Sequence, residues 1–478
     1  MAYSKSVKIV EVSRVTPSPH SPSSAKEFSL PFTFLDTFCF KVPPVQLVYF
    51  YKFTASTSDP SYFNLAILPK LKQSLSLALL HYLPLAGNIR WPSAAPKPFL
   101  LYTPNDDGVS FTVAESDGLG DFDRLIANHE IHESKDFYAL VPELMMSDDI
   151  AAILSLQITL FPHQGFSIGY TIHHSVLDGT SVIMFVNSWA YLCKQGNKPN
   201  SYSLPPELTP FYDRSCIKDP SGLDLIYLNN WIARSNSDPK TNKSLKIWQN
   251  SGVPPDSQAR ATFELTRQDI NKLREKVLSK SDKGKQLHLS TFVISYAYVA
   301  TCLVKLKGEK CRRKVGLAIP VNYRKRLHPP LPATYLGTCG ASHLAFGEAT
   351  KLMDDNGIVF AAELLSDIVK SLDKEQVVQG TETKLLNLFS IGQDSQVELL
   401  SAGGYPKFNF YGADFGWGNP KKVECLLPKA GAFSMFGSSD GSGGVEINLA
   451  LKKHEMETFA ALFINALRRK VPGLTPKL

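Results

Sequence analysis

The sequence is poor in the features that mark secreted, fibrous or zinc-binding proteins. It has seven cysteines in 478 residues, an odd number, and none of them forms a Cys-x-x-Cys pair. This spacing argues against a disulfide framework and a zinc site, and it indicates a reducing, intracellular compartment. Glycine (30 residues) and proline (32 residues) lack a Gly-X-Y repeat, which excludes a collagen-like chain.

A long apolar run is also missing. The first 19 residues contain several charged side chains and no apolar core of the kind that a secretory signal has. The stretch 289–304 carries no charge, but its 16 residues fall short of the roughly 20 that a membrane-spanning helix needs. We therefore expect a cytoplasmic protein without a membrane segment, and we interpret 289–304 as a buried helix.

Charge and length indicate which partners and how many domains to expect. Lysine and arginine (51) exceed aspartate and glutamate (44), and the net charge of +7 suits an anionic small ligand. No zinc-finger spacing or aromatic-rich single-strand motif accompanies this charge, so we expect no nucleic-acid partner. With 44% hydrophobic residues the chain can form packed cores, and its length exceeds the ~250 to 300 residues at which a core usually divides. Two domains are predicted.

The spacing of apolar residues predicts a mixed α and β protein, because strands and helices alternate irregularly in both halves. Strands are predicted at 8–15, 99–102, 109–113, 153–161, 166–172 and 315–321, and helices at 71–82, from 179 onward, after Thr266, at 358–372 and at 456–467. A composition shift toward proline at 198–220 indicates a connector. We place the domain boundary there, between 1–214 and 215–478.

Two local signals sharpen these predictions. The Asn105–Gly108 turn predicts a hairpin between the strands on either side of it. Pro84 is expected to end the helix at 71–82. Thr266, with Asp269 three residues later, resembles a capping box at the start of the helix that follows.

The sharpest candidate for chemistry is His173-His174-Ser175-Val176-Leu177-Asp178-Gly179, between a predicted strand and a predicted helix. Such a corner can expose a side chain to a cleft. A neutral imidazole can take a proton from a hydroxyl, since its ordinary pKa lies near ~6.5. A structural histidine in a buried turn is the alternative. Asp178 is expected to orient the ring, to cap the helix or to form an ion pair that holds the corner.

A second candidate is Asp414-Phe415-Gly416-Trp417-Gly418, which follows a β-rich stretch at 408–411. The glycines permit a close backbone approach or a positive φ, and a tight structural turn is the favoured interpretation. The glycine-rich stretch 437–444 lacks the Gly-Lys-Ser/Thr ending of a P-loop and is interpreted as a hairpin loop. A Gly-x-Ser-x-Gly elbow is absent from the sequence, which argues against a serine hydrolase.

Together, His174-Ser175-Val176-Leu177-Asp178-Gly179 and Asp414-Phe415-Gly416-Trp417-Gly418 resemble the two signature motifs of the plant BAHD acyl-CoA-dependent acyltransferases, in the same order and at a similar separation. The resemblance extends over nearly the whole chain, including stretches 82–87, 210–214 and 289–292. Stretches 321–324 and 332–339 resemble the subgroup that acylates phenolic, flavonoid and anthocyanin glucosides. Leu336 and Thr338 stand where that subgroup usually has Phe and Asn.

The resemblance implies a chloramphenicol-acetyltransferase-like fold, with two similar-sized domains and a solvent channel between them. His174 would be the general base, Asp178 would point away from substrate and pair with Arg324, and donors near Trp417 would stabilise the oxyanion. The channel wall would include Asp414, Phe415, Gly416, Trp417 and Gly418. CoA would be contacted by Ser290 and Thr291. The CoA phosphates would be attracted by Lys276, Lys280, Lys283 and Lys285.

The implied reaction is direct transfer of a malonyl or hydroxycinnamoyl group from CoA to a hydroxyl of a phenolic, flavonoid or anthocyanin glucoside. Malonyl-CoA is the favoured donor. Acyl-CoA would be a co-substrate, with no bound cofactor or metal, and the enzyme is expected to be a monomer. Two alternatives remain, namely a catalytically silent relative that binds phenolics and a thioesterase or other hydrolase that uses Cys339.

Overall fold

Three β-sheets form the frame of the molecule. The computed structural model describes residues 7–19, 22–55, 57–116, 122–128, 130–196, 203–234, 243–247, 257–282, 284–372, 381–427 and 431–468. The first six residues and residues 198–202 of the predicted connector lie outside these ranges. The predicted domain boundary at residue 214 therefore stays a prediction.

The six-stranded sheet is built mostly from the amino-terminal half. Its strands, in spatial order, are β1 (Val7–Val15), β6 (Val109–Ser116), β9 (Leu154–Phe161), β10 (Gly165–Ile172), β3 (Val45–Lys52) and β15 (Lys422–Cys425). Every residue of β9 and β10 is buried. These two strands form the central hairpin, and β10 leads directly into the predicted catalytic corner.

The seven-stranded sheet belongs mostly to the carboxy-terminal half. Its order is β13 (Gly340–Glu348), β12 (Lys314–Asn322), β14 (Val397–Gly403), β16 (Phe433–Gly437), β17 (Val445–Lys452), β11 (Gln258–Leu265) and β7 (His132–Glu133). A smaller sheet has the order β2 (Phe28–Pro31), β5 (Phe99–Tyr102), β4 (Asn88–Arg90) and β8 (Ile150–Ala152).

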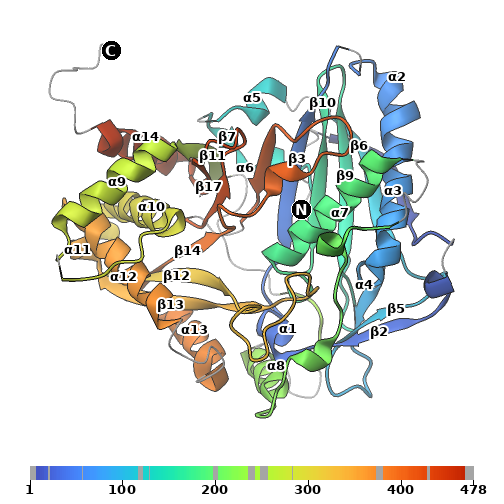
Figure 1. The fold of residues 1–478 in the computed structure, drawn as a ribbon, viewed down its shortest axis with the longest axis horizontal. Coiled ribbons are helices and arrows are strands. Elements are labelled where there is room, and N and C mark those ends of the chain that lie inside the picture. Colours follow the sequence, from blue (N-terminus) through green and yellow to red (C-terminus); the bar gives the residue numbers. More distant parts are fainter. Residues whose placement is uncertain are drawn as a thin grey trace.

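Helices surround the three sheets (Figure 1). They are α1 (Phe34–Phe38), α2 (Pro60–Tyr62), α3 (Leu68–His81), α4 (Leu83–Ala86), α5 (Phe122–Ile126), α6 (Ser134–Tyr138), α7 (Gly179–Gln195), α8 (Leu223–Arg234), α9 (Arg267–Lys280), α10 (Thr291–Lys307), α11 (Ala349–Met353), α12 (Gly357–Ser371), α13 (Lys384–Gln393) and α14 (Lys453–Arg468). Figure 1 shows α3 and α7 beside the six-stranded sheet and α9, α10 and α12 outside the seven-stranded sheet.

The two large sheets exchange strands. β15 leaves the carboxy-terminal half to pair with β3, and β7 leaves the amino-terminal half to pair with β11. Arg260 of β11 and Glu424 of β15 form a buried ion pair, with 3.1 Å between Nε and Oε1. Buried charges of this kind are tolerated when they are paired, so the pair fixes how β15 lies against β11.

Several sequence predictions are confirmed. The predicted buried helix at 289–304 is α10, whose residues from Phe292 to Val304 are all buried. The predicted capping box at Thr266 is present, with the Thr266 hydroxyl and the Asp269 carboxylate each bonded to the other residue's backbone amide. Within the described ranges, no helix combines the length and the apolar character needed to cross a bilayer.

The predicted hairpin around Asn105–Gly108 is wrong. β5 pairs with β2 and β4, whereas β6 pairs with β1 and β9 in a different sheet. Asn105 does adopt the left-handed conformation that the turn signal indicates, with a φ of 68°. The turn passes the chain between two sheets, because burial of apolar faces decides which strands pair.

Two further local predictions need correction. The helix predicted at 71–82 ends at His81, and Pro84 lies inside the short α4 that follows. Proline fits there because the first helical residues need no amide partner. The stretch 408–411, interpreted as β-rich, contains a bend and part of a 3-10 turn at Phe410–Gly412.

Candidate active site

The predicted strand-to-helix corner is present. β10 ends at Ile172, and α7 begins at Gly179 with Asp178 as its N-cap. The Ser181 amide donates to Oδ1 of Asp178 at 2.9 Å, which satisfies one of the free amides at the helix start. The short segment between the two elements carries both histidines on a rigid support.

The two histidines lie in different environments. His173 has no exposed surface, and its Nδ1 accepts a hydrogen bond from the Ser175 amide at 3.3 Å. Burial first, and then the neighbouring His174 and Lys41, lower the pKa of His173 to about 3. His174 is half-buried, so His174 is the more accessible of the two.

The imidazole of His174 is held as a neutral group. Burial lowers its pKa below the ordinary value, while its own backbone carbonyl and the Asp178 carboxylate act in the opposite direction. Its Nδ1 atom is buried and makes no well-formed hydrogen bond. A ligand that approaches from solvent would therefore meet Nε2.

Asp178 and Arg324 form the ion pair that the resemblance implies. Arg324 Nη1 donates to Oδ2 of Asp178 at 2.6 Å, and Nη2 donates to Oδ1 at 3.0 Å. Burial alone would raise the pKa of Asp178, but the charge and hydrogen bonds of Arg324, with the Ser181 and Cys339 amides, hold that pKa below its ordinary value. Both carboxylate oxygens of Asp178 are therefore engaged by Arg324 and by backbone amides.

Arg324 also holds the segment 335–339 against the start of α7. Its Nη2 lies 3.0 Å from the carbonyl oxygens of Tyr335 and Gly337 and from Ser181 Oγ, so its two hydrogens are shared among these acceptors and Asp178. Only 3% of the Arg324 side chain is exposed. The pair thus connects α7 of the amino-terminal half with the residues that follow β12 in the carboxy-terminal half.

A second buried ion pair, which the sequence analysis missed, lies close by. Arg214 Nη1 donates to Oδ2 of Asp36 at 2.6 Å and to the Tyr335 hydroxyl at 3.0 Å. Asp36 also completes a capping box with Thr33 at the start of α1. The Thr-x-x-Asp spacing of that box was the available signal for a fixed acid at position 36.

The Asp414–Gly418 motif lies at the opposite end of α7. Asp414 Oδ2 accepts from Lys194 Nζ, in the last turn of the helix, at 2.6 Å. Its Oδ1 accepts from the amides of Gly416 (2.8 Å) and Gly418 (2.9 Å). Both glycines have positive φ, 105° and 92°, which explains why they are glycine.

The two aromatic residues of the motif pack on the six-stranded sheet and its helices. Phe415 lies edge-on to Trp189 of α7, with 4.9 Å between ring centroids, and Trp417 lies edge-on to Phe166 of β10 at 6.1 Å. Asp178 and Lys194 are 16 residues apart, which along a helix corresponds to about 24 Å. The prediction that donors near Trp417 stabilise the oxyanion is therefore wrong, because such donors must lie about 3 Å from the reacting oxygen.

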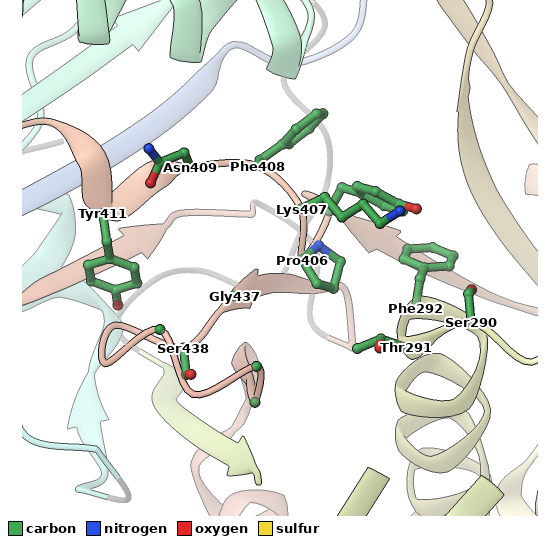
Figure 2. A pocket seen from close by; sticks show the side chains of 14 residues that line it. Ser290, Thr291, Phe292, Pro406, Lys407, Phe408, Asn409, Tyr411, Gly437 and Ser438 are labelled. Carbon is green, nitrogen blue, oxygen red and sulfur yellow. The ribbon is translucent and has the colours of Figure 1, made fainter. Parts of the chain in front are cut away.

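A cavity of about 370 Å³ lies at the start of α10 (Figure 2). Ser290 and Thr291, which the resemblance places near CoA, both line it. The rest of the wall comes from Phe292, from residues between Tyr405 and Tyr411 and from the glycine-rich loop 437–444. That loop does join two antiparallel strands, as predicted, but its position in the cavity wall was missed.

One residue of the cavity wall, Phe408, packs against the catalytic corner. A Cβ atom added to Gly179 would lie 3.0 Å from Cε2 of the Phe408 ring, which lines the cavity. Gly179 is the residue directly after Asp178, so this ring bridges the cavity wall and the corner that carries His174. The sequence does not indicate this contact, because Gly179 and Phe408 are 229 positions apart.

Three of the four lysines predicted to attract CoA phosphates are described by the structure, and these three do not line the cavity. Lys285 lies 3.3 Å from both Glu363 and Asp367. Lys276 donates to the carbonyl of Asp355 at 3.3 Å, and Lys280 is exposed on α9. Lys283 lies outside the described residues. Lys407, which the sequence analysis did not single out, lines the cavity and extends toward the start of α10 (Figure 2).

Replacing Asp178 by Asn should destabilise the protein. The change removes the negative charge and leaves the buried guanidinium of Arg324 unpaired, which typically costs about 3–5 kcal/mol. We expect a lower midpoint in thermal and urea unfolding. Asp123→Asn is the matched control, because Asp123 and Lys52 form an exposed pair whose loss should cost less than about 1 kcal/mol. Equal midpoints for Asp178→Asn and the unmodified protein would contradict this role.

Comparison with known proteins places this geometry in a family. A model of the Transferase family matches residues 5–464. The chain is 42% identical over 475 residues to phenolic glucoside malonyltransferase 1 of Arabidopsis thaliana, covering 97% of this chain and 98% of that one. It is 41% identical over 469 residues to malonyl-CoA:anthocyanidin 5-O-glucoside-6''-O-malonyltransferase of Arabidopsis thaliana, covering 96% and 98%.

The fold is similar to that of the crystal structure of vinorine synthase, with a TM-score of 0.66 over 95% of this chain and 98% of that chain, at 21% identity. The mixed α and β class predicted from the apolar spacing and the chloramphenicol-acetyltransferase-like fold implied by the resemblance are thereby confirmed. With the family model matched over nearly the whole sequence, the chain belongs to the BAHD family of acyl-CoA-dependent acyltransferases.

Proposed function

We propose that this enzyme transfers a malonyl group from malonyl-CoA to a sugar hydroxyl of a phenolic glucoside, with His174 as general base. The observation that carries the proposal is the cavity between α10 and the loop 437–444, because one residue of its wall, Phe408, packs against Gly179 beside the His174 corner. The thioester would enter along this cavity, with Ser290, Thr291 and Lys407 beside the CoA portion. The names of the two Arabidopsis relatives support malonyl as the acyl group and a glucoside as the acceptor.

The chemistry needs one base and no covalent enzyme intermediate. Nε2 of neutral His174 removes the proton of the acceptor hydroxyl while the oxygen attacks the thioester carbonyl carbon. The tetrahedral intermediate collapses, the carbon–sulfur bond breaks, and the imidazolium returns the proton to the CoA thiolate. Holding the thioester and the hydroxyl in line, together with base catalysis, supplies the rate.

The other motif residues act on structure in this proposal. Asp178 and Arg324 fix the corner, and neither carboxylate oxygen of Asp178 is left for the imidazole. Asp414 accepts hydrogen bonds from its two glycines and so fixes the loop that precedes β15. In this way it would hold the side of the substrate channel that the six-stranded sheet forms.

A hydrolase that uses Cys339 is the less favoured function. Burial first raises the pKa of this thiol to about 12, although Arg324 acts to lower it. A thiol with such a pKa carries almost no thiolate at neutral pH and is a poor nucleophile. A silent phenolic-binding relative is also disfavoured, because His174 and the Asp178–Arg324 pair are both intact.

The proposal also places the enzyme in the cytoplasm as a monomer, with no nucleic-acid or membrane partner. All seven cysteines are free thiols, which suits a reducing compartment.

His174→Ala should lower turnover by about 10²- to 10⁴-fold, because it removes the base. Binding of CoA, measured by calorimetry, should remain near the level of the unmodified enzyme. His173→Ala is the matched control and should be far milder, since His173 is fully buried with a pKa of about 3. Equal losses of turnover in the two variants would contradict the assignment of His174.

Gly179→Ala should raise KM for the acyl-CoA by roughly fivefold without unfolding the protein, since overpacking by one methyl typically costs about 1 kcal/mol or more. The new Cβ would press on the Phe408 ring, which would move into the cavity. The double variant Gly179→Ala/Phe408→Leu should recover part of the loss. Gly392→Ala, where an added Cβ meets no atom within 4 Å, should leave kinetics unchanged. A normal KM in Gly179→Ala would mean that the cavity is not the acyl-CoA site.

The donor can be tested by competition. The enzyme is given equimolar malonyl-, acetyl- and p-coumaroyl-CoA with one phenolic glucoside, and the products are separated by mass. We expect the malonyl ester to dominate. A dominant p-coumaroyl ester would overturn the donor and leave the His174 mechanism intact. Rapid release of free acid without any acceptor would instead indicate a hydrolase.

A further inference from the structure

Thr338 lies at the point where the Asp178–Arg324 and Asp36–Arg214 ion pairs meet the catalytic corner. Its side chain is buried, with 2% of the residue exposed. The Thr338 hydroxyl donates a hydrogen bond to the backbone carbonyl of His174 at 2.9 Å. Its backbone amide donates to Oδ1 of Asp36 at 3.3 Å. One residue therefore connects the carbonyl of the base to a buried acid on a different element.

The acid at the far end of this connection is itself fixed. Oδ2 of Asp36 accepts from the Thr33 amide and hydroxyl, both at 2.8 Å, and from Arg214 Nη1 at 2.6 Å. Asp36 is 1% exposed and the Arg214 side chain is 5% exposed. Hydrogen bonds to charged groups in such buried surroundings are short and strong, so Asp36 gives Thr338 a stationary support.

The residues on either side of Thr338 are held by the start of α7. The Gly337 amide donates to Ser181 Oγ at 3.2 Å, and the Cys339 amide donates to Oδ2 of Asp178 at 3.1 Å. The backbone at Thr338 therefore has little freedom to move. This leaves the Thr338 hydroxyl in a defined place relative to the His174 carbonyl.

We propose that Thr338 is a positioning residue whose hydroxyl fixes the backbone of His174, so that Nδ1 stays turned inward and Nε2 is the ring nitrogen left for the substrate. The inference rests on the proposed role of His174 as general base and adds a residue to it. Nδ1 of His174 is buried without a well-formed hydrogen bond, so the ring depends on its own backbone for its orientation. Without the hydroxyl, the carbonyl can turn and the ring can rotate away from the productive geometry.

The kinetic test compares Thr338→Val, which removes the hydroxyl at constant shape, with Thr338→Ser, which keeps it. We expect kcat to fall roughly tenfold in Thr338→Val, the effect of about one lost hydrogen bond, while KM for the acyl-CoA stays nearly unchanged. Thr338→Ser should recover most of kcat. Thr301→Val is the matched control, because Thr301 is buried and donates to the Ala297 carbonyl at 2.7 Å inside α10, where it should change stability and not kcat.

A spectroscopic readout separates this inference from the proposed function. In protein labelled with ¹⁵N-histidine, with the His174 signals assigned from His174→Ala, the ring should show one neutral tautomer in the unmodified protein and a mixture in Thr338→Val. Unchanged ring signals, or a kcat loss that Thr338→Ser shares in full, would overturn the positioning role. If no thioester is used by the unmodified enzyme, the proposed function fails, and the tautomer comparison still decides the role of Thr338.

Discussion

The ion pair between Asp178 and Arg324 is the interaction on which the catalytic corner depends. It joins the first turn of α7 to residues that follow β12, and through the Tyr335 and Gly337 carbonyls it also fixes the segment 335–339. Taking two charges out of water is costly, and the cost is offset here because the carboxylate and the guanidinium are almost fully hydrogen-bonded. An aspartate in a catalytic motif can thus serve the reaction without touching substrate, because it fixes the positions of the two halves of the chain on either side of the base.

The two signature motifs act at opposite ends of one helix. The first supplies the base and the N-cap of α7, whereas the second binds Lys194 in the last turn of the same helix. α7 is therefore held at both ends, one end by a buried pair and the other by a half-exposed pair. The length of α7 keeps the second motif away from the reacting atoms. The glycines and aromatic rings of that motif therefore have a structural role.

The catalytic corner is supported by a network that extends beyond the motifs. Asp36 and Arg214 lie far apart in the sequence, yet they meet beside Tyr335 and hold Thr338 in place. The cavity is assembled in the same way, from the start of α10, the 405–411 segment and the loop 437–444. Its link to the corner is a contact between one aromatic ring and a glycine.

The sequence by itself determined what depends on neighbouring residues and on recognisable motifs. The capping box at Thr266, the buried α10, the β9–β10 hairpin and the strand-to-helix corner at His174 all follow from short-range patterns. The tertiary structure alone decided which elements meet. It separated β5 from β6, placed Trp417 far from the base, engaged Lys285 in ion pairs and brought Thr338 to the His174 carbonyl. The physical reason is that pairing and burial depend on contacts between residues hundreds of positions apart, and local propensity contains no information about those contacts.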